Sequence, residues 1–183
     1  MNVTPELDAR FREAAIREGI VDVRFDVIES PVGALLLAAT DRGLCRISYT
    51  IEGGDESLAR AFGTRVLKTR LDDVRRELDE YFGGRRQTFD LALDLRVAGF
   101  QGAVLDELAR VPYGRTDTYG HLAAKVGRPR AARAVGMVMN RNPIPIVLPC
   151  HRILGANGSL TGYAGGLHVK RALLELEGAA LPL

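Results

Sequence analysis

An apolar segment bounded by three prolines reads Asn142-Pro143-Ile144-Pro145-Ile146-Val147-Leu148-Pro149-Cys150-His151-Arg152. Pro143, Pro145 and Pro149 each remove a backbone donor and fix φ, and each shifts the preceding residue toward extended geometry. We therefore expect a rigid extended loop, neither the interior of a helix nor a central strand. Free cysteine is often a buried small hydrophobe, but functional side chains are concentrated on such loops. We interpret Cys150 as a presented nucleophile with His151 beside it.

Composition is that of an ordinary globular protein. Hydrophobic residues make up 46% and charged residues 26% of the 183 residues, which suits one large domain or two small ones. No apolar stretch is long enough to span a membrane, and the acids within residues 1–20 suit neither a secretory signal nor a transit peptide. We expect a cytoplasmic protein that does not enter a membrane.

The two cysteines, Cys45 and Cys150, are far apart and belong to no CxxC or histidine-spaced pattern. That arrangement indicates neither a disulfide framework nor a structural zinc site. We expect no metal and no cofactor. Cys45 falls in a predicted strand, where packing is the expected role.

Charge divides unevenly along the chain. Residues 1–95 contain 14 Lys and Arg against 18 Asp and Glu, whereas residues 96–183 contain 11 against 5. From Arg110 to Arg171 the only acid is Asp117. A basic half favours a polyanionic partner, and a merely solvated basic face is the alternative.

The first half of the chain shows the periodicities of an α/β unit. Thr4 followed by Pro5 predicts the start of a helix that runs to about Glu18 and ends at Gly19. Loose alternation and short turns then predict three strands in a meander, over residues 21–28, 34–39 and 44–49. Further on we expect a polar loop over residues 52–56, helices over 58–62 and 69–82, and a strand or extended linker over 89–95.

From Phe100 the pattern changes to helices joined by short loops. A first helix begins at Phe100 and ends at the turn 111–114; Thr118 then caps a helix over 119–125, and another follows over 130–139. Two short helices with a glycine-containing turn predict a helix-turn-helix, which in a basic segment favours nucleic acid as partner. The second of these helices starts with small residues around Arg133, so its backbone could approach a partner such as a narrow groove closely. Packing of the alanines against another helix is the alternative, but it does not explain Arg133.

With these motifs assembled, the chain resembles the O6-alkylguanine-DNA alkyltransferases, a family of DNA repair proteins. The resemblance covers roughly residues 28–178, and Leu105 replaces a tryptophan of the family, which we interpret as a core substitution. It rests on Phe100-Gln101, Val111-Pro112-Tyr113-Gly114, Tyr119, Ala132-Arg133-Ala134-Val135-Gly136, Asn142-Pro143, Pro149-Cys150-His151-Arg152, Gly162-Tyr163-Ala164-Gly165-Gly166 and Leu173-Leu174-Glu175-Leu176-Glu177-Gly178.

The resemblance implies a two-domain α/β plus α fold. We expect a helical extension over residues 1–20, a ribonuclease H-like α/β domain over 21–95, and a mostly α, winged-helix-like DNA-binding domain with a helix-turn-helix over 96–183. It also implies an activity: transfer of an alkyl group from O6 of guanine, and from O4 of thymine, to Cys150, irreversibly and once per molecule. The damaged nucleotide would first leave the duplex, since the alkyl group lies inside the base stack.

Residue roles follow from the same resemblance. Glu177 would orient His151, which would deprotonate Cys150 through a water molecule, because adjacent side chains of an extended loop point apart. Asn142 would brace the loop, Tyr119 would help rotate the nucleotide and assist the leaving group, and Arg133 would fill the gap in the duplex. The DNA-binding set is completed by Thr118, Arg128, Arg130, Ala131, Ala132 and Gly136, and the base pocket by Pro145, Ile153, Tyr163, Ala164 and Gly165.

The expected partner is double-stranded DNA that contains O6-alkylguanine, bound through the minor groove. We expect a monomer and leave cooperative binding along DNA open. Two alternatives remain: a recognition module that binds the lesion without chemistry, which Cys150 argues against, and a thiol-dependent hydrolase of small molecules, which would not need Arg133. A transcription regulator would leave the presented cysteine unexplained.

Overall fold

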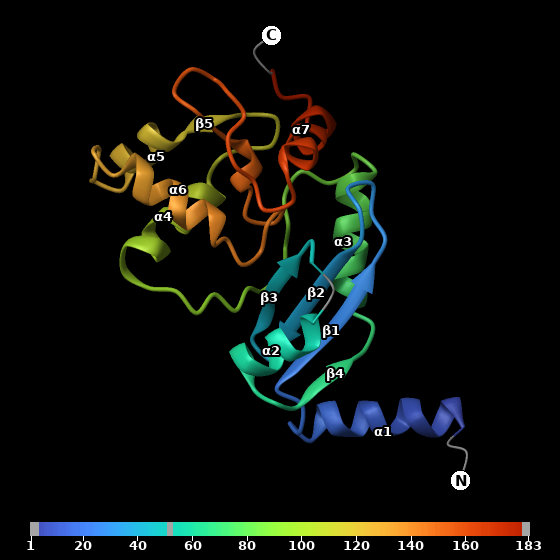
Figure 1. Ribbon diagram of the computed structural model, residues 1–183. Helices are drawn as coiled ribbons and strands as arrows, with labels where there is room; N and C mark the ends of the chain where they lie inside the picture. Colours follow the sequence, from blue (N-terminus) through green and yellow to red (C-terminus); the bar gives the residue numbers. More distant parts are fainter. Residues whose placement is uncertain (1–3, 51–52, 181–183) are drawn as a thin grey trace.

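The computed structural model describes residues 4–50 and 53–180. An α/β unit and a mostly helical unit lie against each other (Figure 1). The first unit contains α1 (Pro5–Arg17), β1 (Val23–Ile28), β2 (Leu35–Thr40), β3 (Gly43–Ser48), α2 (Gly54–Phe62), β4 (Val66–Lys68) and α3 (Asp72–Phe82). The second contains α4 (Gly99–Ala109), β5 (Asp117–Thr118), α5 (Tyr119–Lys125), α6 (Ala132–Asn140), the 3₁₀ turn η1 (Cys150–Arg152), β6 (Ile153–Leu154) and α7 (Leu167–Leu176).

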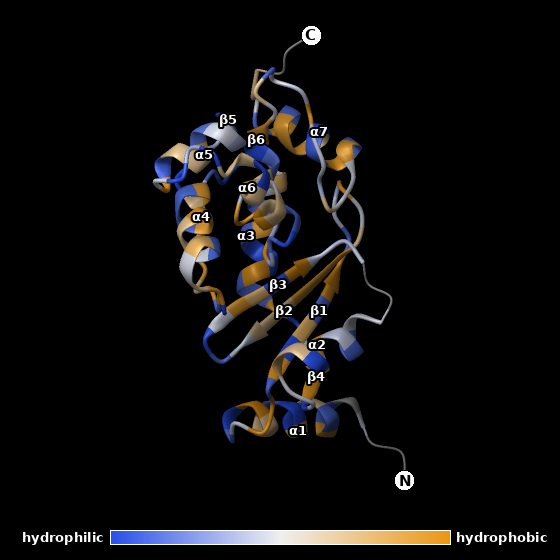
Figure 2. Ribbon diagram, turned by 60° about the vertical axis from the view of Figure 1, so that its left-hand side comes forward, coloured by the Kyte–Doolittle hydropathy of each residue, from blue (hydrophilic) through white to orange (hydrophobic). Residues whose placement is uncertain are grey.

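The sheet of the first unit has the order β3-β2-β1-β4. β1, β2 and β3 pair antiparallel, which confirms the predicted meander, and β4 pairs parallel to β1. Every residue of β2 is buried, because helices cover both faces of the sheet. Leu35 and Leu37 face α3 and the second unit, while Leu36 and Ala38 pack toward α2. The strands accordingly form the apolar centre of the unit (Figure 2).

Local caps explain the helices that were predicted best. Thr4 Oγ1 accepts the backbone N–H of Leu7 at the start of α1, and Thr118 Oγ1 accepts that of His121 at the start of α5. Each bond satisfies a donor that has no partner within the helix. Packing predictions also hold: Cys45 is 1% exposed and Leu105 is 1% exposed.

Three helix starts differ from the sequence prediction. α3 begins at Asp72 instead of Thr69, because Thr69 N donates to Phe25 O and continues the extended pairing of β4. α6 begins at Ala132 instead of Arg130, since Ala131 N closes a turn on Arg128 O. α2 begins at Gly54, inside the segment expected to be a polar loop.

Two other segments were incompletely predicted. β4 was missed, because a three-residue strand has too little alternation to be recognised. The segment 89–95 is an extended linker with a single bridge, in which Leu44 N donates to Ala92 O and Asp94 N donates to Leu44 O.

One continuous core joins the two units. Leu37 and Ile47 of the sheet, Leu78 of α3, Leu108 of α4 and Leu173 of α7 belong to the same buried cluster. The active-site segment is therefore held from both sides. Within the part of the chain that the structure describes, no helix is both long and apolar enough to cross a membrane.

Candidate active site

The proline-bounded segment is tightly folded around Ile146. This residue has φ of 76° although it is β-branched, and it is fully buried. Leu148 N donates to Ile144 O at 2.9 Å, and Asn142 Nδ2 donates to Leu148 O at 2.8 Å. A left-handed β-branched residue is strained and persists only where the surroundings enforce it. The hydrogen bonds and the burial of Ile146 hold the loop in this conformation, and its rigidity stays a prediction from the prolines.

The prediction that Cys150 and His151 belong to an extended loop is wrong. Cys150–Arg152 forms one turn of 3₁₀ helix, in which Arg152 N donates to Pro149 O at 2.9 Å. The prolines restrict only themselves and the residues before them, so the geometry after Pro149 was not fixed by them. The argument that the two side chains diverge because the backbone is extended falls with it.

Cys150 is buried, and its sulfur accepts a side-chain hydrogen bond from Asn142. The residue is 5% exposed, and Asn142 Nδ2 lies 3.0 Å from Sγ. Burial raises the pKa of the Cys150 thiol to about 11, although the Asn142 hydrogen bond and the positive charge of Lys170 oppose the rise. At that pKa only roughly one thiol in 10⁴ is ionised at pH 7. A nearby base is therefore needed for the thiolate to form during reaction.

His151 meets the requirements for such a base. Its Nε2 lies 2.9 Å from Oε1 of Glu177. Because an ionised carboxylate only accepts hydrogen bonds, Nε2 carries the proton and Nδ1 keeps a free lone pair. Nδ1 is buried and has no hydrogen-bond partner among the described residues. Burial lowers the pKa of the His151 imidazole despite the neighbouring Glu177, so the ring is neutral at pH 7.

Glu177 is buried and collects donors from separate segments of the chain. Besides His151, its carboxylate accepts Tyr81 Oη–H at 2.7 Å, Arg152 Nε and Nη2 at 2.9 Å each, and Gly114 N at 3.2 Å. Burial alone would raise the pKa of Glu177, but the hydrogen bonds from His151 and Arg152 hold it at about 2. The carboxylate thus stays ionised and keeps the imidazole in one orientation and one tautomer.

Four residues of this site were not identified from the sequence. Arg152 and Tyr81 bind Glu177 directly, and Tyr113 Oη–H donates to Leu176 O at 3.1 Å. Lys170 is fully buried and donates from Nζ to Ile153 O at 2.5 Å and to Thr161 O at 3.0 Å. The presence of Arg152 beside the Cys-His pair was a usable signal. Tyr81 had none, because its partner lies 96 positions away.

The surface next to the thiol is formed by α5, α6 and the loop 156–162. A cavity of about 550 Å³ lies there, lined among others by Tyr119, Arg133, Gly136 and Gly162. Tyr119 Oη accepts Thr161 Oγ1–H at 3.0 Å, and the Tyr119 ring lies 3.9 Å from where a Cβ on Gly136 would be. Small residues on α6 therefore leave the floor of this cavity open, with Arg133 exposed at its edge.

The remaining predicted DNA-binding residues lie on the same helix-turn-helix. Arg128 and Arg130 are exposed in the turn, and the Arg128 guanidinium lies 5.2 Å from the centroid of the Phe100 ring. Ala131 precedes α6, Ala132 is its first residue, and both are half-buried. The Thr118 hydroxyl is engaged in capping α5.

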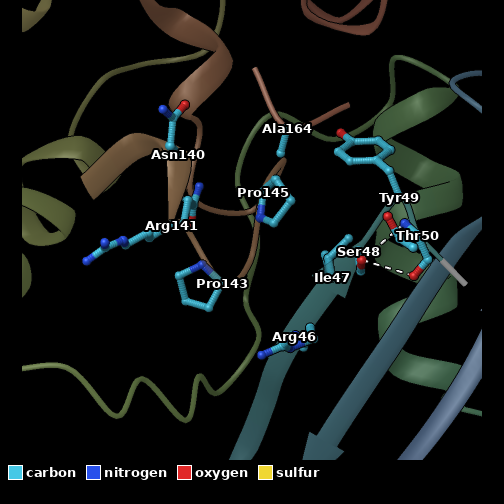
Figure 3. Close-up of a pocket in the computed structure, with 11 residues that line it drawn as sticks. Arg46, Ile47, Ser48, Tyr49, Thr50, Asn140, Arg141, Pro143, Pro145 and Ala164 are labelled. Atoms are coloured by element: carbon cyan, nitrogen blue, oxygen red, sulfur yellow. Dashed lines mark hydrogen bonds between the residues drawn. The ribbon is translucent and has the colours of Figure 1, made fainter. Parts of the chain in front are cut away.

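The predicted pocket residues come from three segments. Pro145 and Ala164 both line a second cavity, of about 320 Å³, beside the active-site loop (Figure 3). Tyr163 has its ring centroid 6.4 Å from that of His151, and Gly165 follows in the same loop. Ile153 is fully buried in β6.

Fold and site together define a two-unit protein in which a buried thiol and a histidine–glutamate pair lie beside a helix-turn-helix. Two models of the 6-O-methylguanine DNA methyltransferases match the chain: the ribonuclease-like domain over residues 23–95 and the DNA binding domain over residues 99–179. The chain belongs to this family, as its similarity to full-length relatives also shows. A methylated-DNA–protein-cysteine methyltransferase of Methanosarcina barkeri is 42% identical over 153 residues, which cover 84% of this chain and 96% of the relative.

Solved structures agree with this placement. The O6-methylguanine methyltransferase of Mycobacterium tuberculosis superposes with a TM-score of 0.77 at 40% identity, covering 87% of this chain and 95% of its own. The OGT protein of the same organism, solved in complex with DNA, gives 0.75 at 41% identity, with 85% and 92% covered. The predicted fold class, a ribonuclease-like α/β domain followed by a mostly helical DNA-binding domain, is thereby confirmed.

Proposed function

We propose that the protein repairs DNA directly, by moving an alkyl group from O6 of guanine, and from O4 of thymine, onto Sγ of Cys150. One observation carries the proposal: a buried thiol held by Asn142 lies in the same turn as an imidazole fixed by Glu177. The Sγ–carbon bond would form as the carbon–O6 bond breaks. The electron pair of that bond stays on guanine, which takes up a proton as it leaves.

His151 accepts the proton that the thiol loses. The free lone pair of Nδ1 is the basic site, and a water molecule between Nδ1 and Sγ would carry the proton. Glu177 stabilises the imidazolium that results, because its carboxylate is already ionised and in contact with Nε2. Asn142 donates to the sulfur and favours its anionic form.

The alkylated base has to reach this buried thiol outside the duplex. We propose that Arg133, exposed at the start of α6, occupies the space left in the duplex, while Tyr119 assists rotation and then the leaving group. Small residues on α6 fit the narrow minor groove. The basic C-terminal half supports contact with phosphates, since charge attraction contributes most of non-specific DNA affinity. The OGT–DNA complex of Mycobacterium tuberculosis supports DNA as the partner.

The product is a thioether, which offers no route back to the thiolate. The protein would therefore be consumed once per lesion and would need no cofactor, since the nucleophile is itself the acceptor. A recognition module without chemistry would not need a thiol coupled to a base. A hydrolase would turn over, and it would not need the open α6 surface.

The test is intact-protein mass spectrometry after incubation with duplex DNA that contains O6-methylguanine. We expect one added methyl group, mapped to Cys150, saturating at one per protein. Cys150→Ala should abolish transfer and leave duplex binding within about twofold, since the Cys150 side chain is buried and offers little surface for contact with the duplex. An unchanged wild-type mass with tight lesion binding would favour the recognition module, and transfer by Cys150→Ala would end the proposed mechanism.

A further inference from the structure

The end of β3 brings a tyrosine of the α/β unit against the loop that borders the proposed base pocket. Tyr49 follows directly after β3, and its hydroxyl lies 2.8 Å from the hydroxyl of Tyr163. The two rings pack edge to face with centroids 5.8 Å apart. The phenol of Tyr163 is thus held by a residue 114 positions earlier in the chain.

Tyr49 also touches the backbone of this loop. A Cβ atom on Gly165 would lie 3.0 Å from three ring carbons of Tyr49. That separation is shorter than ordinary van der Waals contact, so a side chain at position 165 would require the ring of Tyr49 to shift by a few tenths of an ångström. The loop 163–165 is therefore supported by Tyr49 both at a hydroxyl and along its main chain.

The strand that leads to Tyr49 is bound to the segment that carries the nucleophile, Cys150. Ile47 N, two residues earlier, donates to Pro143 O at 2.9 Å and so joins β3 to the segment that carries Cys150. The pKa values of Tyr49 and Tyr163 are raised, mainly by burial and further by the nearby charge of a Cys150 thiolate. Both phenols consequently stay protonated and keep their hydrogen bond throughout the ordinary pH range.

A cavity of about 320 Å³ lies beside the junction of β3 and the active-site loop, and Tyr49, Pro145 and Ala164 are part of its lining. Figure 3 shows the ring of Tyr49 extending from the end of β3 toward Ala164. Because Pro145 and Ala164 are also assigned to the base pocket, this cavity adjoins that pocket. Tyr49 occupies the space into which the loop 163–165 would have to move to make room for a bulky alkyl group.

We propose that Tyr49 is a positioning residue that sets the size of alkyl group the site accepts, by holding Tyr163 and the 163–165 backbone against the pocket. The inference rests on the proposed alkyl transfer. With Tyr49 in place, a methyl group is confined near Sγ for in-line attack. A larger alkyl group clashes with the loop 163–165, because Tyr49 prevents this loop from moving away. Binding of the duplex, which uses α6, does not involve Tyr49.

The experiment compares two duplexes of one sequence, carrying O6-methylguanine or O6-benzylguanine, with wild type, Tyr49→Phe, Tyr49→Ala and Phe62→Ala. The rate at saturating protein and the protein concentration at half-maximal rate are measured for each. Phe62 is a matched control, because it is an aromatic residue of the same unit that packs on the opposite face of the sheet. Thermal midpoints of all four proteins report their stability.

Tyr49→Ala should raise the benzyl-to-methyl rate ratio by about tenfold, the scale on which pocket shape discriminates substrates. Tyr49→Phe, which keeps the ring, should slow methyl transfer about fivefold through loss of the hydrogen bond, without changing the half-maximal concentration. Phe62→Ala should lower the thermal midpoint and leave the ratio unchanged. A ratio that stays constant or falls in Tyr49→Ala overturns the inference, whereas a wild type that transfers neither group overturns the proposed function itself.

Discussion

Glu177 fixes the active site by accepting hydrogen bonds from four other residues at once. Its position in the sequence, at the C-terminal end of α7, is one at which an acid is ordinarily solvated. In the structure the residue is 5% exposed, and its partners come from α3, the turn after α4, and η1. Hydrogen bonds from these donors hold the pKa of the carboxyl group at about 2, so that Glu177 is ionised at neutral pH.

Replacement of Glu177 by glutamine should destabilise the protein by about 3 kcal/mol, because Arg152 would remain buried without its counter-ion. The folded pKa of about 2 lies below the ordinary value of 4.5. The stabilising contribution is therefore complete above about pH 4.5 and is lost as the pH falls toward 2. Urea unfolding of wild type and Glu177→Gln between pH 2.5 and 7 measures both effects. Equal pH dependence in the two proteins would contradict this account.

At the scale of elements, α5 and α6 each have one side packed in the core and one side exposed to solvent. Leu122, Val135 and Met139 are buried in the core, whereas Arg133 and Met137 are exposed on α6. The open side of the two helices borders the cavity at Tyr119. The packed side fixes the position of both helices relative to Cys150. The helix-turn-helix is therefore fixed relative to the active site, as the proposed delivery of a base to Cys150 requires.

Arg133→Ala should reduce transfer from duplex DNA by at least tenfold and transfer from free O6-benzylguanine by less than twofold. Only the duplex reaction needs a residue to occupy the space of the displaced nucleotide, because only there must a base be unstacked and unpaired, at a cost of a few kcal/mol. Second-order rate constants for the two substrates give the comparison, with Arg141→Ala as a control, because Arg141 is an exposed arginine that follows the C-terminal end of the same helix. Equal losses on both substrates would remove the proposed role of Arg133.

The success of sequence prediction also varied by element. Helices with side-chain caps, such as α1 and α5, were placed well, because the residues that define their starts are local. β4 and the true start of α3 depend on Phe25 and Asp26 of a neighbouring strand, since Leu71 N donates to Asp26 Oδ2 at 3.0 Å. No local pattern carries such information. The same holds for η1, whose turn geometry follows a proline that does not restrict it.

For the molecule as a whole, one buried cluster extends from the sheet to α7, so that the two domains share their core. Local motifs predicted Cys150 as nucleophile, and the family resemblance supplied His151, Glu177 and Asn142. The α/β unit was predicted as a separate domain, and its contribution of Tyr81 to the site was not foreseen. Contacts between segments far apart in sequence are visible only once the chain is folded.

A shared core predicts a single unfolding transition. The chain contains no tryptophan, and Tyr81 and Tyr113 pack edge to face with ring centroids 6.1 Å apart. Near-ultraviolet circular dichroism, which reports tyrosine packing, and far-ultraviolet dichroism, which reports helices and strands, should therefore give the same thermal midpoint. Calorimetry should show one peak. Two separated transitions would mean that the domains unfold independently.

The outer edge of β3 is already occupied. Leu44 exchanges hydrogen bonds with the linker at Ala92 and Asp94, and Ile47 N is bound to Pro143 O of the active-site segment. A free strand edge is a template on which other chains pair and aggregate. The helical domain and its linker thus cover the edge of β3 and prevent it from pairing with other chains. A proteolytic fragment that ends before residue 89 would lack this cover, and its exposed β3 edge would promote self-association.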